Sequence, residues 1–415
     1  MGAAVSIPGA DWSSGGRLAA GGRRRFVLGL AGAATLVAAS SCAGGGPIGS
    51  TGPTGSVDST GSTVAKPAAT APRPRASATS RPSSESGSPP THVQKLRLST
   101  CAARNGIEFG TSAASWQLSD TGYAALVDAQ ADVVLTEDDL LWYRLRPSPT
   151  AALDFRYADA FFDHAEKHRQ RVVGAHLVWD DGFGDGWTTD ALNGLSRRRA
   201  RTLLFDTLEA TVKRYRHRGA SAWIVANEVT GPDGDSGLRT DVPWYNTIGS
   251  GYVGEAFQRA RSQDGSAVLI LNDFGFETVD EDGNDPVARQ RAMLQVLDAL
   301  RRDSVPVDAV GVQAHLLADG FADRFDARQY RGFLAAIADR GVKIVITELD
   351  VQDDGVPADA AVRDRAVADV YRRYLDVALQ EPAVKTVIAF GLSDRYTWLD
   401  EDVPRTDGAH PATPL

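Results

Sequence analysis

Short apolar runs alternate with longer amphipathic segments along the chain from residue 96 onward. Several of these runs are almost continuously apolar and rich in Val and Ile, which is typical of strands covered on both faces. The longer segments carry apolar residues three and four positions apart, which predicts helices with one buried face. The expected strands are 107–113, 132–136, 171–179, 222–227, 267–272, 309–315, 343–347 and 386–391. The expected helices include 158–169, 197–218, 286–302, 326–340 and 360–381.

Strands that alternate with helices in this way predict a (β/α)8 TIM barrel, an α/β fold, for residues 96–415. A doubly wound open sheet is the competing arrangement, but it normally carries a glycine-rich phosphate turn after its first strand, and the sequence has none there. Walker, His-Glu-x-x-His and Gly-x-Ser-x-Gly motifs are also missing from the sequence. Only a tail with Pro, Gly and Asp follows the last expected strand, so we expect the final outer helix to be absent.

The residues before the barrel segment differ in character. Three consecutive arginines precede an apolar stretch at 26–39 that is too short to span a bilayer, and their order resembles a twin-arginine signal. We interpret 1–42 as an export signal, in which Cys42 after Ala-Ser-Ser resembles a lipoprotein processing site. Residues 43–95 are mainly Gly, Ser, Thr, Pro and Ala, which bury too little apolar surface to fold, so we expect a disordered tether.

Charge and cysteine content narrow the expected partners. The net charge of −9 leaves no basic face for a nucleic acid. Membrane contact is expected only through a lipid anchor at Cys42, which would hold the folded part at the cell surface or leave it extracellular. Cys101 is the only other cysteine, either unpaired in the core or, if Cys42 is not lipidated, formally open to a disulfide. No feature indicates an oligomer, so we expect a monomer.

Two glutamates stand at the ends of expected strands. Glu228 follows the run 222–227, and Glu348 follows the run 343–347. The carboxyl ends of barrel strands meet at one mouth, where enzymes of this fold have their active sites. One such Glu is more readily a helix cap or a salt-bridge residue, but two at matching positions favour the paired carboxylates of a glycosidase. A retaining glycosidase holds the pair roughly 5 to 5.5 Å apart.

The residues around both glutamates resemble glycoside hydrolase family 10, the retaining endo-β-1,4-xylanases. Residues 223–228 read Trp-Ile-Val-Ala-Asn-Glu and resemble the family's Trp-x-x-x-Asn-Glu acid/base motif. Residues 346–350 are similar to its nucleophile motif. Further runs follow the family's order at 174–179, 271–274, 311–316 and 391–398. The resemblance extends from about residue 105 to residue 398, nearly the whole expected barrel.

This resemblance implies roles for individual residues. Glu228 would be the general acid and then the general base, and Glu348 the nucleophile. His315 would donate to Glu348 and be oriented by Asp350, although a histidine packed in the core is the alternative. Contacts with the sugar are implied for Asn227, which would hold the 2-hydroxyl, and for Gln313, Glu137, Trp179 and Trp398. Trp142 and Trp187 are weaker candidates for sugar contact and fit structural positions.

The sequence departs from the family pattern where the glycone sugars would bind. In place of Glu-Asn-x-x-Lys-Trp, Asp138 replaces an amide and Leu141 replaces a lysine. Ala175 replaces a histidine, and we expect His176 not to substitute for it, because a shift of one residue along a strand turns a side chain to the opposite face. Two further replacements are Asp180 for a histidine and Phe390 for a tryptophan.

Together these observations predict a retaining glycoside hydrolase that cleaves internal β-1,4 bonds of xylan or a related plant polysaccharide. Neither a cofactor nor a metal is required, because two carboxylates and water suffice. Two alternatives stay open: the same chemistry on a different β-glycan, and a carbohydrate-binding surface protein with weak or lost catalysis.

Overall fold

The structure is a computed structural model, and it describes residues 97–184, 186–232, 236–279, 283–399, 403–405 and 407. The expected export signal with Cys42 and the expected tether lie outside the described residues. Cys101, in helix α1 (Leu98–Arg104), is a free and partly buried cysteine. Within the described ranges, no helix combines the length and the apolar character that a membrane crossing requires.

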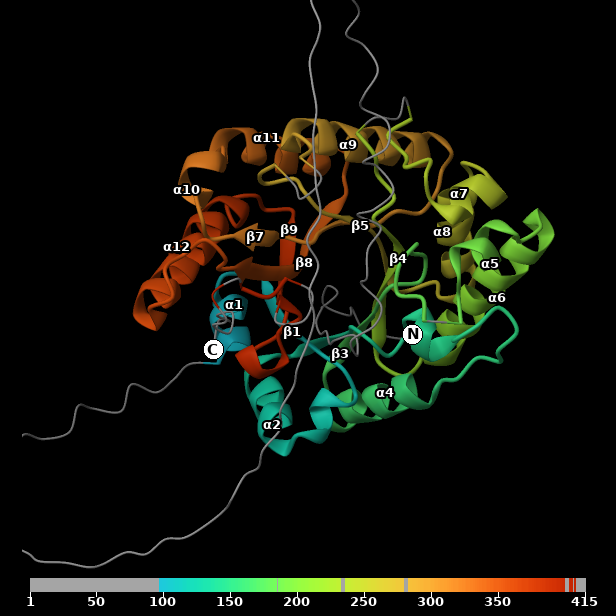
Figure 1. Cartoon of the computed structure of the whole chain (residues 1–415), viewed down its shortest axis with the longest axis horizontal. Coiled ribbons are helices and arrows are strands. Elements are labelled where there is room, and N and C mark those ends of the chain that lie inside the picture. Colours follow the sequence, from blue (N-terminus) through green and yellow to red (C-terminus); the bar gives the residue numbers. More distant parts are fainter. Residues whose placement is uncertain are drawn as a thin grey trace, which may run out of the picture. The chain divides into compact units, whose positions relative to one another are not determined.

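Parallel strands close into a (β/α)8 barrel, which confirms the predicted fold (Figure 1). Strands β1 to β6 pair in sequence order, β6 pairs with β8, and β9 pairs with β1 to close the ring. The short β7 continues the sixth position of the barrel beyond β6 and pairs with β8. The strands are β1 (Glu108–Ala113), β2 (Val133–Thr136), β3 (Arg171–Gly174), β4 (Ala220–Asn227), β5 (Val268–Asp273), β6 (Ala309–Val312), β7 (His315–Leu317), β8 (Lys343–Gln352) and β9 (Val384–Ala389).

The helices form a layer outside the strands (Figure 1). Several begin at an acidic capping residue: the side chain of Asp285 accepts from Val287 N ahead of α9, and Asp326 accepts from Arg328 N and Gln329 N ahead of α11. The helices after α1 are α2 (Thr121–Gln130), α3 (Trp142–Leu145), α4 (Arg156–His168), α5 (Thr189–Asn193), α6 (Arg197–Tyr215), α7 (Pro243–Ile248), α8 (Tyr252–Gln263), α9 (Pro286–Arg302), α10 (Phe321–Arg324), α11 (Ala327–Ala338) and α12 (Ala360–Ala378).

Two apolar cores hold this architecture together. The smaller one fills the barrel with side chains from alternate positions of the strands, among them Val173, Ile224 and Ile388, all fully buried. The larger one lies between the strands and the helices. Both faces of most strands are therefore covered, which is why several strands are continuous apolar runs in the sequence.

Several strands end at different places than expected, and the differences are largest for β3 and β8. β3 stops at Gly174, and beyond it Val178 makes only an isolated bridge to Ala226. β8 continues to Gln352, and its register against β9 shifts between Ile346 and Leu349. Such an irregularity re-aims the side chains within it, and Glu348 is one of them.

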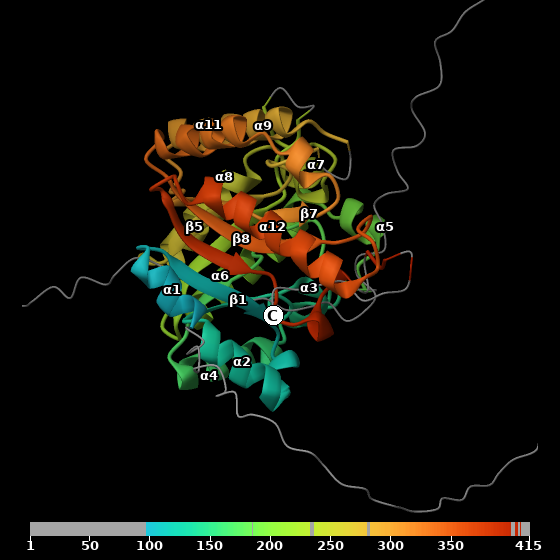
Figure 2. The same ribbon diagram turned by 90° about the vertical axis from the view of Figure 1, so that its left-hand side faces the viewer.

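The segment after β9 turns back over α2. In the described part of this segment, Asp394–Tyr396 form the 3-10 turn η2, and no outer helix comparable with α12 is present. The ring centroids of Tyr396 and Tyr123 lie 4.6 Å apart, and the Tyr396 hydroxyl donates to Asp120 Oδ2 over 2.8 Å. In Figure 2, α12 crosses in front of the strands and α2 lies at the bottom of the view.

Candidate active site

Glu228 lies at the carboxyl end of β4, and Glu348 lies in the carboxyl-terminal half of β8. Glu228 directly follows β4, and its backbone N–H donates to Asn272 O at the end of β5 over 3.0 Å. Its φ of 55° is in the left-handed region, which costs a non-glycine residue about 1–3 kcal/mol. Glu348 lies inside β8, and its backbone N–H donates to Gln313 O over 3.0 Å. The backbone thus ties each acid to the neighbouring strand end.

The carboxylate of Glu348 is buried among nitrogen donors. Asn272 Nδ2 lies 2.8 Å from Oε1, His176 Nε2 lies 3.5 Å from Oε1, and His315 Nε2 lies 3.5 Å from Oε2. Burial alone would raise the pKa of Glu348, but hydrogen bonds from His176 and His315, together with the electrostatic attraction of both imidazole rings, hold that pKa well below its ordinary value. Glu348 is therefore ionised at neutral pH.

His315 is held as a cation by its own carboxylate partner. Its Nδ1 lies 2.8 Å from Asp350 Oδ1, while Trp398 Nε1 donates to Asp350 Oδ2 over 2.5 Å. Burial would lower the pKa of His315, but the charges of Asp350 and Glu348 and hydrogen bonds to both raise it to about 10. The imidazolium therefore donates through both ring nitrogens, one to each carboxylate.

Glu228 has neutral partners. Trp179 Nε1 donates to Oε2 over 2.8 Å, and Gln313 Nε2 donates to Oε1 over 2.9 Å. The side chain is only partly buried, unlike that of Glu348. The two carboxylates therefore stand in different electrostatic surroundings, one facing a cation and the other facing uncharged N–H groups.

A chain of amides joins the two acids. Asn227 Oδ1 accepts from Asn272 Nδ2 over 2.7 Å and from Gln313 Nε2 over 3.3 Å. Because Asn272 also binds Glu348 and Gln313 also binds Glu228, the chain runs from one carboxylate to the other. Among the described residues, Asn227 Nδ2 has no hydrogen-bond partner although it is buried. That donor is therefore available to a ligand.

The expectation for His176 is wrong. We expected it to face away from the position of the missing histidine, yet its ring reaches Glu348. The alternation of strand side chains does not apply to it, because β3 ends at Gly174 and His176 lies beyond the strand. Its Nδ1 is buried and has no partner among the described residues.

Asn272 belongs to the run 271–274 that resembles the family, but no role was expected for it, and none was expected for Arg239. Asn272 is held by Thr347, whose Oγ1 donates to its Oδ1 over 2.7 Å, and it ends an expected strand as Glu228 does, which was the available signal. Arg239 pairs with Asp180 over 2.9 Å and donates to the backbone oxygen of Glu228 over 3.1 Å. It lies in a loop with no strand pattern, so nothing in the sequence placed it there.

The other residues expected to contact the sugar differ in how far their side chains are exposed. Glu137, just after β2, accepts from Ser112 Oγ over 2.9 Å and is buried. Trp179 is 6% exposed, so it offers little ring face, whereas Trp398 is half-buried and packs edge-on against His315 with ring centroids 5.2 Å apart. Trp142 and Trp187 pack against each other in the core, 5.1 Å apart, as structural residues would.

Most of the residues that depart from the family pattern are buried and contact other side chains of the protein. Asp138 is fully buried, pairs with Arg144 over 2.8 Å and accepts from Trp116 Nε1 over 2.8 Å. Leu141 is buried, Ala175 belongs to the core inside the barrel, and the Phe390 ring packs edge-on against His315. The amide and lysine of the family pattern are thus replaced by an internal ion pair and an apolar side chain.

Comparison with known proteins agrees with the fold. The model of glycosyl hydrolase family 10 matches residues 97–412. The chain belongs to this family. It is 28% identical over 311 residues to endo-1,4-beta-xylanase B of Thermotoga neapolitana, a match that covers 74% of this chain and 84% of the relative. It is 26% identical over 306 residues to endo-1,4-beta-xylanase A of Phanerodontia chrysosporium, covering 73% of this chain and 70% of that one.

Solved structures of the family superpose on the barrel. Xylanase 10B of Thermotoga petrophila RKU-1, in complex with xylobiose, aligns with a TM-score of 0.66 and 25% identity over 78% of this chain and 92% of that chain. Native xylanase 10B of Thermotoga maritima aligns with a TM-score of 0.65 and 26% identity over 77% and 92%. The family 10 chain described here is accordingly a glycoside hydrolase of the endo-1,4-β-xylanase type.

Proposed function

We propose that this family 10 enzyme hydrolyses internal β-1,4 bonds of xylan by double displacement, with retention at the anomeric carbon. The observation that carries the proposal is the contrast between two linked carboxylates. Glu348 is kept ionised by its imidazole neighbours, while the Glu228 carboxylate accepts hydrogen bonds from uncharged donors. A nucleophile must be ionised and a general acid must hold a proton, so this contrast supports the assignment of Glu348 and Glu228 to these roles.

In the first step, the Glu228 carboxyl gives its proton to the glycosidic oxygen while a Glu348 oxygen attacks the anomeric carbon. The bond between that carbon and the leaving oxygen breaks, and a covalent glycosyl-enzyme forms. In the second step, Glu228 removes a proton from water, the hydroxide oxygen attacks the same carbon, and Glu348 leaves as a carboxylate.

Two buried side-chain nitrogens near Glu348 are open to a bound sugar: that of Asn227 is a donor, and the role of the His176 nitrogen depends on its tautomer. Asn227 Nδ2 and His176 Nδ1 both lack partners among the described residues. We assign Asn227 to the hydroxyl next to the anomeric carbon, a contact that strengthens in the transition state. His315 and Asp350 position the nucleophile rather than the sugar, because their polar atoms are engaged with Glu348 and Trp398.

Substitutions test the two roles separately. Glu228→Gln should lower the rate of reducing-sugar release from xylan by roughly 10² to 10⁴-fold, since general acid catalysis contributes about that factor. An aryl xyloside with an acidic leaving group needs no protonation, so Glu228→Gln should retain far more activity on it. Glu348→Gln should lose activity on both substrates. Glu166→Gln, at an exposed position on α4, is the matched control and should leave both rates unchanged.

The stereochemistry and the site of cleavage need direct measurement. Proton NMR of the first products should show the β-anomer before mutarotation, and viscosity of a xylan solution should fall well ahead of reducing-end release. Initial appearance of the α-anomer would contradict double displacement. Faster turnover of a mixed-linkage β-glucan than of xylan would assign the enzyme a different glycan, and binding of xylan without turnover would leave only a carbohydrate-binding role.

We also propose export of the enzyme and its attachment through Cys42. This rests on the sequence of residues 1–95 alone. Lipid labelling of the wild-type chain but not of Cys42→Ser, in cells that process lipoproteins, would support the anchor, and equal labelling of both would exclude it.

A further inference from the structure

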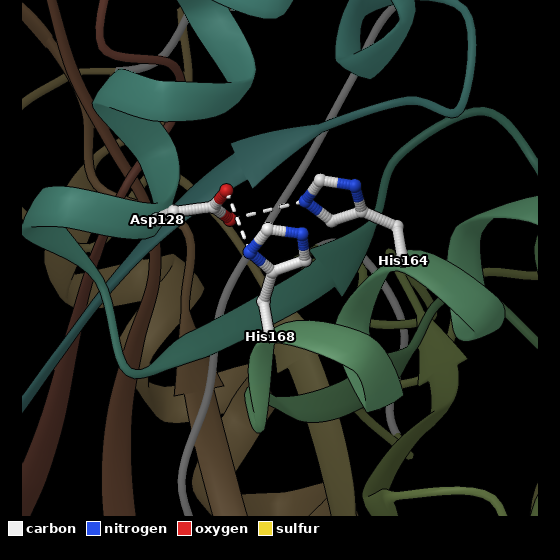
Figure 3. A group of neighbouring side chains, drawn as sticks. All are labelled: Asp128, His164 and His168. Atoms are coloured by element: carbon white, nitrogen blue, oxygen red, sulfur yellow. Dashed lines mark hydrogen bonds and ion pairs between the residues drawn. The ribbon is translucent and has the colours of Figure 1, made fainter.

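A group of metal-ligating side chains lies on the outside of the barrel, between helices α2 and α4 (Figure 3). Asp128 is in the last turn of α2, and His164 and His168 stand four positions apart at the end of α4. His164 Nε2 lies 3.0 Å from Asp128 Oδ1, and His168 Nδ1 lies 2.8 Å from Asp128 Oδ2. The two imidazole rings are nearly parallel, with centroids 4.3 Å apart.

The spacing suits one metal ion. Residues at i and i+4 of a helix lie on one face, so both imidazoles point to the same side of α4, and the carboxylate reaches them from α2. One ligand atom from each residue falls within 4.8 Å of the others. Among the described residues, this is the one group of three or more such side chains that meets this limit. One nitrogen of each imidazole now faces an oxygen of the Asp128 carboxylate, and small side-chain rotations would direct all three side chains at a shared ion.

The chemistry of these ligands selects a class of ion. Two imidazoles and one carboxylate match zinc and its neighbours in the first transition series, whereas Mg²⁺ and Ca²⁺ prefer oxygen ligands. All three side chains are partly buried, with 17%, 21% and 29% of the side chains of His164, Asp128 and His168 exposed. That leaves an opening for water as a further ligand and a path for the ion to enter.

The surroundings also favour a cation. Both helices end at this cluster, and the C-terminal end of a helix carries partial negative charge. Arg97 is the neighbouring cation, but it binds Asp132 over 3.0 Å and the backbone oxygen of Asp128 over 3.2 Å, which leaves the Asp128 carboxylate to the imidazoles. Lys167, between the two histidines in sequence, is exposed to solvent.

We propose that Asp128, His164 and His168 form a binding site for a divalent transition-metal ion of the zinc class. β2 begins shortly after α2 and β3 shortly after α4, so the site is near the start of these strands, at the opposite end of the barrel from Glu228 and Glu348. The ion would cross-link α2 to α4 and stabilise the folded state by binding it preferentially. It takes no part in glycoside cleavage.

The test uses the full chain, free of any histidine tag and stripped of metal, with zinc chloride as the probe. Equilibrium dialysis should show one more bound zinc per chain for the wild type than for His164→Gln/His168→Gln. Zinc should raise the thermal unfolding midpoint of the wild type but not of that variant, and magnesium should raise neither. His217→Gln, at an exposed histidine outside the cluster, should behave as the wild type.

A second variant tests the zinc site even if His164→Gln/His168→Gln folds poorly. Asp128→Asn keeps the shape of the side chain and removes its charge, and it should also lose the extra zinc and the rise in unfolding midpoint. Equal zinc binding by the wild type and the folded variants, or no zinc-dependent rise in the wild type, would overturn the proposal. Xylan hydrolysis by the folded variants should stay at the wild-type level, so a failure here is distinguishable from a failure of the catalytic assignment.

Discussion

Replacing His315 with Gln removes the positive charge that lies beside Glu348 and keeps a side-chain N–H donor. In the wild type, His315 Nε2 lies 3.5 Å from Glu348 Oε2, and the pKa of His315 is raised to about 10, so the charge is present throughout the acid range. His176 and Asn272 remain in place in the variant. The change therefore tests the charge of His315 apart from the hydrogen bonds around the carboxylate.

The size of the effect follows from the separation of the two groups. An opposite charge within about 4 to 6 Å lowers a carboxyl pKa by roughly 1 to 3 units, and its loss leaves burial, which acts in the other direction, less opposed. Because His176 still contributes, we expect the acid limb of kcat/KM to move upward by about one to two pH units. That movement corresponds to roughly 1.4 to 2.7 kcal/mol of lost preference for ionised Glu348.

The assay is the pH dependence of kcat/KM for xylan hydrolysis, because this profile reports ionisations of the free enzyme. His217→Gln makes the same chemical change at an exposed position and should reproduce the wild-type profile. Circular dichroism at each pH separates a kinetic effect from acid unfolding.

One result would refute the reasoning. If the rate of His315→Gln fell by a constant factor at every pH and its acid limb stayed in place, the charge of His315 would not be what keeps Glu348 ionised. His315 would then act only by packing or by orienting its neighbours.

Further predictions concern packing and stability. Gly311→Ala would place a new Cβ 2.1 Å from Asn272 Oδ1 and so displace that side chain. The variant should have a lower kcat/KM and a free energy of unfolding, measured in urea, that is lower by about 1–3 kcal/mol. Unchanged activity would show that catalysis does not need Asn272 in this position. Gly332→Ala, on the exposed face of α11 with open space around it, should instead stabilise by roughly 0.5–1 kcal/mol. Burial would lower the pKa of His315, but Asp350 and Glu348 outweigh burial and raise the pKa from the ordinary 6.5 to about 10. The charged His315 therefore stabilises the fold fully below pH 6.5, and this contribution is lost as the pH rises through about 10. The Asp350→Asn variant should show a flatter alkaline decline than the wild type in unfolding experiments, and an equal decline would contradict the coupling.

Most of the barrel could be predicted from the sequence because its strands are buried on both faces and its helices on one. The expected helix 286–302 coincides with α9, and the expected strand 222–227 lies within β4. The prediction was weakest where a strand meets the mouth. At 171–179 the apolar run continues past the point where β3 ends, and composition alone does not reveal where hydrogen-bonded pairing stops.

The candidate site could also be predicted only in part from the sequence. The positions of Glu228 and Glu348 follow from strand periodicity, since each closes an apolar run. The reach of His176 to Glu348 was not predictable, because His176 lies beyond the end of β3, where the alternation of strand side chains no longer fixes an orientation. The bridging role of Asn272 depends on contacts at sequence separations of 45 and 76 residues.

The sequence by itself determined the order of strands and helices, through local patterns of apolar and polar residues. It also indicated the family and the pair of acids, through short motifs that resemble those of the family. The tertiary structure alone decided which neighbours each acid has, and hence that Glu348 faces an imidazolium while Glu228 faces uncharged donors. It also decided that Asp128 meets two histidines from a different helix, 36 positions and more along the chain. Electrostatic environment depends on distances of a few ångströms between residues far apart in sequence, and only the closed barrel sets those distances.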